Sequence, residues 1–323
     1  MKTLSSAARI YPFTKLQKIF LPIVAAIVIG SVALMIFKQP NYGIDFAGGT
    51  VIQIRYDSGV PTDAIRSALS GTVFDGAQIQ EFGGPDEAVI KAPAASNSLG
   101  LDVGDQIREI LKDTGGFEIR KIDMVGAKVG EQLRSAGTMA VFFSLVGILL
   151  YVAFRFEWRF AIAATLCAAH DVIVTLGFIL LFNVPINLDI LAAVLTVLGY
   201  SLNDTIVVFD RIREIMGKPG VSELNDTIDE AITKTLSRTI LTSLTTLFVV
   251  FATYMLGGEL LKPLSLVLIA GITIGTLSSI FVAAYLLKPF GVSVSAWRIK
   301  EAEKARIKAE KIRMRSLYER SAV

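Results

Sequence analysis

The chain has 323 residues, of which 53% are hydrophobic and 19% charged, and its mean hydropathy is +0.58. A soluble domain averages about 25% charged residues and does not gather its apolar residues into long runs. The net charge is +3, and Lys and Arg are concentrated in segments that flank the apolar runs. This charge is therefore explained by membrane topology and does not indicate nucleic-acid binding. The single cysteine, Cys167, excludes an intrachain disulfide, and the composition as a whole excludes an ordinary soluble protein.

Six apolar runs are each long enough to cross a bilayer, because about 20 residues at about 1.5 Å per residue match about 30 Å of hydrocarbon. We predict transmembrane helices at residues 19–37, 135–154, 160–182, 188–209, 236–256 and 263–287. The first run is longer than the apolar segment of a signal peptide, and residues 37–40 do not resemble a cleavage site. We therefore expect the first run to be retained as a membrane span.

Lys and Arg are concentrated in every second segment between these runs. They are frequent in residues 1–18, in the segments after the second and fourth runs, and in the tail 288–323, but nearly absent from residues 183–187 and 257–262. Because positively charged segments stay in the cytoplasm, we predict that both termini are cytoplasmic. Residues 38–134 then form a domain on the other side of the membrane.

This domain has an alternating pattern of short strands and helices. The sequence predicts strands at 49–56, 77–82, 87–91 and 117–124, and helices at 61–69 and 101–112. The order βαββαβ is typical of ferredoxin-like domains. We therefore predict an α-helical polytopic membrane protein with six transmembrane helices, and an α+β ferredoxin-like domain between the first two.

The ferredoxin-like fold hosts many functions, so it specifies no activity by itself. The domain shows no metal-ligand or nucleophile–base spacing, and the chain contains no phosphate-binding P-loop sequence. We expect the domain to bind a partner or to couple its movement to that of another part of the machinery. We expect neither an enzymatic activity nor a cofactor.

Asp204 is the most unusual residue in the membrane part, because it lies inside the apolar run 188–209. A carboxylate there costs several kcal/mol and normally faces a polar cavity, a partner or a proton pathway. Arg238, just inside the next run, is a candidate partner, and Asn203 is adjacent. A nearby guanidinium favours the ionised form of the acid, and desolvation favours the protonated form. A movement of Arg238 would therefore make Asp204 take up or release a proton. Alternatively, Asp204 is held in a static ion pair, and Arg238 extends to the headgroups.

His170 and Asp171 form a second candidate site near the middle of the run 160–182. His170 is the only histidine in the chain, and histidine titrates near neutral pH unless its surroundings change this. The two residues are candidates for a proton relay with Asp204. The alternative for His170 is an interhelical hydrogen bond that fixes packing.

Two further patterns predict structure. Gly271 and Gly275 have the small-xxx-small spacing of closely packed membrane helices. Residues 223–232 have the pattern of an amphipathic helix lying on the cytoplasmic membrane surface.

Five sequence blocks are more specific than these patterns. They are GIDFAGGT at 43–50, VGAKVG at 125–130, FRFEWR at 154–159, AHDV at 169–172 and GYSLNDTIVVFDRIRE at 199–214. Together they resemble the SecF family, the accessory membrane subunits of the bacterial Sec protein-export machinery, within the resistance–nodulation–division superfamily. The resemblance extends from Tyr42 to about Tyr285 and leaves out the extreme N-terminus and the basic tail.

The resemblance implies a subunit of the bacterial inner membrane that uses the proton motive force to assist late steps of protein export. It implies SecD, the SecYEG channel, YajC, the translocating polypeptide and membrane lipid as partners, and it places residues 38–134 in the periplasm. The proton-responsive acid of the family maps to Asp204, and its functionally important arginine maps to Arg238.

Two alternatives remain open at this point. One is a small-solute proton antiporter of the same superfamily, which would be expected to carry two large extracytoplasmic domains and about twelve spans. The other is a purely structural subunit that stabilises the channel complex without proton chemistry.

Overall fold

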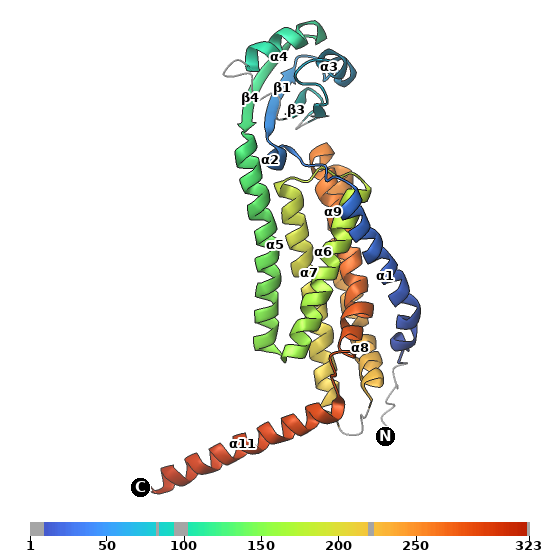
Figure 1. The fold of residues 1–323 in the computed structure, drawn as a ribbon, viewed down its shortest axis with the longest axis vertical. Helices are drawn as coiled ribbons and strands as arrows, with labels where there is room; N and C mark the ends of the chain where they lie inside the picture. The colour runs from blue at the N-terminus through green and yellow to red at the C-terminus, as the bar shows by residue number, and fades with distance from the viewer. Residues whose placement is uncertain (1–9, 82–83, 94–102, 219–222, 322–323) are drawn as a thin grey trace, which may run out of the picture.

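The computed structural model describes residues 10–81, 84–93, 103–218 and 223–321. Within these residues, six helices are long and apolar enough to span a membrane. A four-stranded antiparallel sheet with two helices lies at one end of the helical bundle, and helix α11 (Val294–Ser321) extends from the other end (Figure 1). The predicted fold class is confirmed.

Five of the six spanning helices are longer than the predicted apolar runs, mainly because the helical backbone begins before the apolar residues. The six helices are α1 (Phe13–Phe37), α5 (Ala127–Arg155), α6 (Trp158–Leu181), α7 (Leu188–Met216), α8 (Leu224–Leu256) and α9 (Gly258–Ser278). A π-helical turn, η3 (Ser279–Ala283), and α10 (Ala284–Leu286) continue α9.

The separate surface helix predicted at residues 223–232 is wrong. This segment forms the first turns of α8, and its Ile228 and Ile232 are buried in the core of the bundle. Burial against neighbouring helices removes these side chains from water more completely than a membrane surface could, which explains why the segment joins the span.

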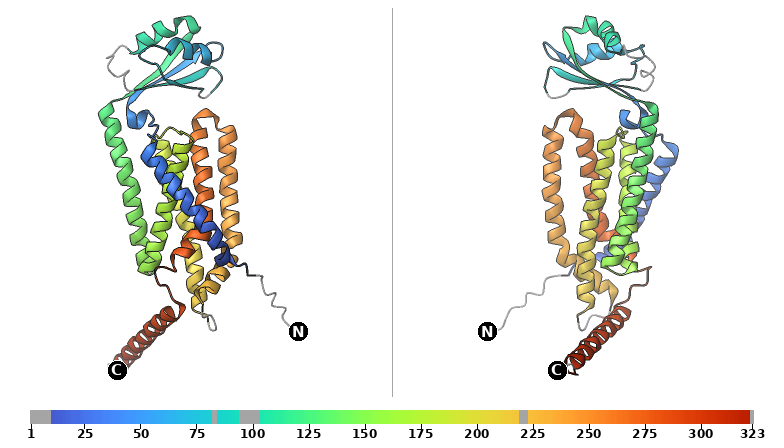
Figure 2. Two further views of the ribbon diagram at one scale, coloured as in Figure 1. Left: turned by 45° about the vertical axis from the view of Figure 1, so that its right-hand side comes forward. Right: turned by 90° about the vertical axis from the view of Figure 1, so that its left-hand side faces the viewer.

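The small domain has the predicted βαββαβ order. Its elements are β1 (Gly49–Tyr56), α3 (Thr62–Leu69), β2 (Gln78–Glu81), β3 (Glu87–Pro93), α4 (Val103–Leu111) and β4 (Phe117–Val125). The sheet order is β2-β3-β1-β4 with all neighbours antiparallel, so β3 separates β1 from β2, as in a split βαβ unit. Helices α3 and α4 cover the sheet face that points away from the bundle (Figure 2). Parts of the predictions for residues 1–18, 77–82, 101–112 and 288–323 lie outside the described residues.

The chain enters this domain through α2 (Ile44–Ala47), a short helix that the sequence did not predict. Just before α2, Gly43 N–H donates to Ile186 O at 2.8 Å. The side chain of Asp45 accepts from the backbone N–H of Leu188, the first residue of α7, at 3.0 Å. After α2, Gly48 and Gly49 have φ values of +78° and +154°, which only glycine adopts readily. The entry to the domain is therefore fastened to the start of α7.

Helix α9 packs closely against α7 at the predicted small residues. A Cβ atom added at Gly271 would overlap the side chain of Val197, and one at Gly275 would lie 3.0 Å from Ser201 Cβ. The close-packing prediction for Gly271 and Gly275 is confirmed.

We expect Gly271→Ala to destabilise the bundle by about 1–3 kcal/mol, because the added methyl must displace Val197 in a packed interface. Thermal unfolding of the purified protein in detergent measures the effect. Gly147→Ala is the matched control, since a Cβ atom there meets nothing within 4 Å. Equal melting temperatures for the two variants would contradict the close packing.

Candidate functional site

Asp204 lies on the buried side of α7. It is 3% exposed, and its Oδ2 atom has no hydrogen-bond partner among the described residues. Most of the side chains that α7 buries are apolar, including Val197, Val208 and Phe209. A buried acceptor without a partner costs free energy, so this carboxyl group is held where its charge is least favourable.

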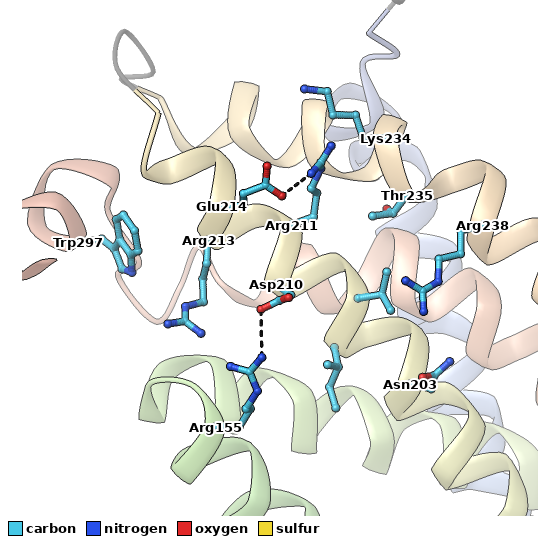
Figure 3. Close-up of a pocket in the computed structure, with 12 residues that line it drawn as sticks. Arg155, Asn203, Asp210, Arg211, Arg213, Glu214, Lys234, Thr235, Arg238 and Trp297 are labelled. Carbon is cyan, nitrogen blue, oxygen red and sulfur yellow. Dashed lines mark hydrogen bonds and ion pairs between the residues drawn. The ribbon is translucent and has the colours of Figure 1, made fainter.

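Arg238 lies on α8 and is exposed to a cavity of about 820 Å³ at the end of the bundle opposite the α+β domain. Asn203 lines the same cavity, and its side chain lies close to that of Arg238 in Figure 3. Asp204, although adjacent to Asn203 in sequence, does not line the cavity. The cavity brings two of the predicted site residues together and leaves the acid buried.

Asp204 and Arg238 form no ion pair within 4.0 Å in the structure as described. The positive charge of Arg238 nevertheless acts on the Asp204 carboxyl group through space. The two groups are therefore neighbours without a direct contact. This separation differs from the static ion pair that the sequence left open.

The hydroxyl groups around this pair fall into two classes. Thr242 and Thr246, which follow Arg238 along α8, each donate to a carbonyl of their own helix at 3.0 Å. By contrast, the buried hydroxyls of Tyr200 and Thr239 have no partner among the described residues. The hydroxyls of Tyr200 and Thr239 are therefore unpaired, whereas those of Thr242 and Thr246 are already engaged.

Asp171 is completely buried and connects three helices. Its Oδ2 atom accepts hydrogen bonds from Ser201 of α7 and from Ser278 of α9, the latter at 2.8 Å. Its Oδ1 atom lies 2.8 Å from Nδ1 of His170. His170 therefore pairs with its own neighbour, and Asp171 makes the interhelical hydrogen bonds.

Sequence reasoning identified Asp171 and missed both of its serine partners. The sequence carried a signal for Ser201 only. Ser201 lies three residues before Asp204, so the two share a helix face. In the structure, Ser278 directly precedes the π-helical turn η3. Such turns occur frequently at functional sites.

The two carboxyl groups therefore have different surroundings. Asp171 has three polar partners, whereas one oxygen of Asp204 has none. No group of His, Cys, Asp and Glu residues suited to a metal ion occurs in the part of the chain that the structure describes.

Comparisons with known proteins place the chain in a family. Residues 106–292 match the family model "Protein export membrane protein SecD/SecF, C-terminal", and residues 33–60 match "SecD/SecF GG Motif". The second match includes α2 and the glycine pair Gly48 and Gly49.

Several curated relatives share the name "Protein translocase subunit SecF". The protein from Helicobacter pylori strain J99 is 39% identical over 96% of this chain and 97% of its own length. The Vibrio alginolyticus protein is 46% identical over 79% of this chain and 82% of its own length. The Escherichia coli O157:H7 protein is 37% identical over 90% and 91%, respectively.

A solved structure has the same fold. The crystal structure of SecDF from Thermus thermophilus, a translocon-associated membrane protein, aligns with a TM-score of 0.75 and 33% identity. The alignment covers 87% of this chain but only 39% of the SecDF chain, so this chain corresponds to about two-fifths of that protein. The chain belongs to the SecD/SecF family of protein-export membrane proteins and is one of its SecF members.

Proposed function

We propose that the chain is an accessory subunit of the Sec translocase that couples the proton motive force to late steps of protein export. The observation that carries the proposal is the buried Asp204 carboxyl group, with one unpartnered oxygen and the charge of Arg238 nearby but not in contact. A group in this position can change its protonation when a cation approaches or withdraws.

The proposed topology is that of a bacterial inner-membrane protein with both termini in the cytoplasm and residues 38–134 in the periplasm. The distribution of Lys and Arg supports it. The bundle 135–287 then carries the proton pathway, and the tail 288–323, which includes α11, is cytoplasmic. The cavity that holds Arg238 would open toward the cytoplasm, and Asp204 would lie between this cavity and the membrane interior.

The proposed partners are SecD and the SecYEG channel, with the translocating polypeptide as the substrate. The alignment of this chain with part of a SecDF chain supports SecD as a partner. Phe248 and Leu256 on α8 are 76% and 86% exposed, so this helix has an apolar face available for SecD or for membrane lipid. Because the chain belongs to the SecF family, we include YajC among the proposed partners.

In the proposed cycle, Asp204 takes up a proton while Arg238 is withdrawn and releases it when the guanidinium approaches. Asn203, beside both groups, would orient Arg238 or a water molecule in the cavity. The free hydroxyls of Tyr200 and Thr239 would carry the proton to or from Asp204. Asp171 and His170 would hold α6, α7 and α9 in register and are second candidates for the relay.

The proposal is tested by export into inverted membrane vesicles that contain the chain with SecD and SecYEG. A proton gradient should stimulate late export, and an ionophore that collapses the gradient should remove this stimulation. Stimulation that persists without the gradient would favour a purely structural subunit. Gradient-driven efflux of a small solute by the chain alone would favour the antiporter alternative.

We expect Arg238→Lys to retain charge in the cavity but to reduce gradient-driven stimulation severalfold. Lysine lacks the planar fork of donors that arginine presents to a carboxylate. Lys234→Arg, in the same cavity and paired with Glu230, is the matched control and should retain full stimulation. Full activity of Arg238→Lys would mean that a point charge is sufficient.

A further inference from the structure

Two arginines from different helices lie against one buried aromatic ring at the end of the bundle opposite the α+β domain. The guanidinium carbons of Arg155, at the end of α5, and Arg213, on α7, are 5.2 and 5.0 Å from the centre of the Phe156 ring. Their side chains extend toward one another in Figure 3. Because like charges repel, this arrangement is favourable when an anion lies near both groups.

The nearby carboxylates do not supply such an anion to Arg213. Asp210 is 3.8 Å from Arg155, Glu214 pairs with Arg211, and Glu157 is 2.8 Å from Lys300. Arg213 forms no ion pair with any carboxylate that the structure describes, and its buried Nε atom has no hydrogen-bond partner there. The charge of Arg213 is therefore left uncompensated.

A second unpartnered donor lines the same cavity. The indole Nε1 of Trp297 is buried and has no partner among the described residues. Its position is maintained by Arg298, which donates to the carbonyl oxygens of Met216 and Lys218 at the end of α7. An acceptor with several oxygens would satisfy both the guanidinium and the indole N–H.

The site lies at the level where lipid headgroups are expected. Phe154, directly before Arg155, is 96% exposed and belongs to the apolar span, and the exposed Trp158 begins the next helix. Exposed aromatic residues beside arginines are typical of the membrane–water interface. The most abundant anions at this depth are the phosphates of phospholipids.

We propose that Arg155, Arg213 and Trp297 bind the phosphate of an anionic phospholipid headgroup. The planar guanidinium groups match the tetrahedral oxygens of a phosphate, and basic pockets between membrane helices suit such headgroups. The acyl chains would extend along the exposed face of α5 beside Phe154. The site is distinct from the Asp204 carboxyl group and does not depend on proton coupling.

The full chain in detergent tests this proposal, with Trp297 as the reporter. The chain has two tryptophans, so a Trp158→Phe background makes the fluorescence specific for Trp297. Phosphatidylglycerol is titrated in, with phosphatidylcholine and inorganic phosphate at matched ionic strength in parallel. We expect a saturable response to phosphatidylglycerol that Arg213→Gln weakens about tenfold, since charge-assisted hydrogen bonds are lost.

Arg211→Gln is the matched control, because it removes the same charge from the same helix and cavity but from a residue paired with Glu214. It should change the affinity less than about twofold, as expected for an exposed ion pair. An equal loss in both variants, or none in Arg213→Gln, would overturn the site. An Arg213-dependent response to inorganic phosphate alone would overturn the lipid as its source. Loss of SecD binding by Arg213→Gln with lipid affinity unchanged would also overturn it.

Discussion

Replacing Asp204 with asparagine is expected to reduce gradient-driven export to the rate measured after the gradient is collapsed. The asparagine side chain would have nearly the same shape as the carboxyl group but could neither release a proton nor respond to Arg238. The buried Oδ2 atom of Asp204 has no hydrogen-bond partner, so the substitution breaks no hydrogen bond of this atom. The variant should therefore keep the fold and its association with SecD and SecYEG. Export of a reporter protein into energised vesicles measures the effect.

The control for this experiment is Asp226→Asn, the same chemical change at an exposed position in the first turn of α8. The Asp226→Asn variant should support export at the same rate as the unmodified chain. Co-purification of the Asp204 variant with SecD and SecYEG separates loss of coupling from loss of assembly. Unchanged gradient-driven stimulation in Asp204→Asn would exclude the acid as the coupling group.

Asp171→Ala is expected to destabilise the helical bundle. The change leaves Ser201, Ser278 and His170 without their common acceptor and opens a cavity between three helices. Interhelical hydrogen bonds in membranes contribute modestly, and unpaired buried groups cost more, so we expect a loss of about 1–3 kcal/mol. Thermal unfolding in detergent measures it.

Asp171→Asn separates the structural role of this residue from a role in the relay. The amide oxygen can still accept from Ser201 and Ser278, so most of the stability should return. If this variant is stable and also exports at the full rate, Asp171 is not a proton carrier. If it is stable but has lost the gradient response, Asp171 belongs to the relay. A melting temperature for Asp171→Ala equal to that of the unmodified chain would contradict the described hydrogen bonds.

Local patterns predicted the elements well. The apolar runs identified all six spanning helices, and alternating strands gave the ferredoxin-like domain, because both signals depend on residues close together in sequence. The predicted end of α7 was too early and the predicted start of α8 too late. The length of an apolar run corresponds to the part of a helix inside the hydrocarbon layer, whereas the helix itself continues beyond it. The energetic cost of burial also identified Asp204 and Asp171 correctly as buried groups.

The contacts within the site could not be predicted in the same way. Ser278 lies 107 residues from Asp171 in sequence, and serine is common in membrane helices without forming such a bond. The joint contact of Arg155 and Arg213 with Phe156 also depends on how α5, α6 and α7 pack. Composition and spacing carry no information on such packing.

The bond between Asp45 and the first residue of α7 makes this helix a rigid connection between two distant parts of the molecule. From Leu188 to Asp204 the helix is about 24 Å long, at about 1.5 Å per residue. At its upper end, Asp45 and Gly43 hold the segment that leads directly into β1. Only the short helix α2 and Gly48 separate this attachment from β1, so an axial shift of α7 at Asp204 would act directly on the entry to the α+β domain.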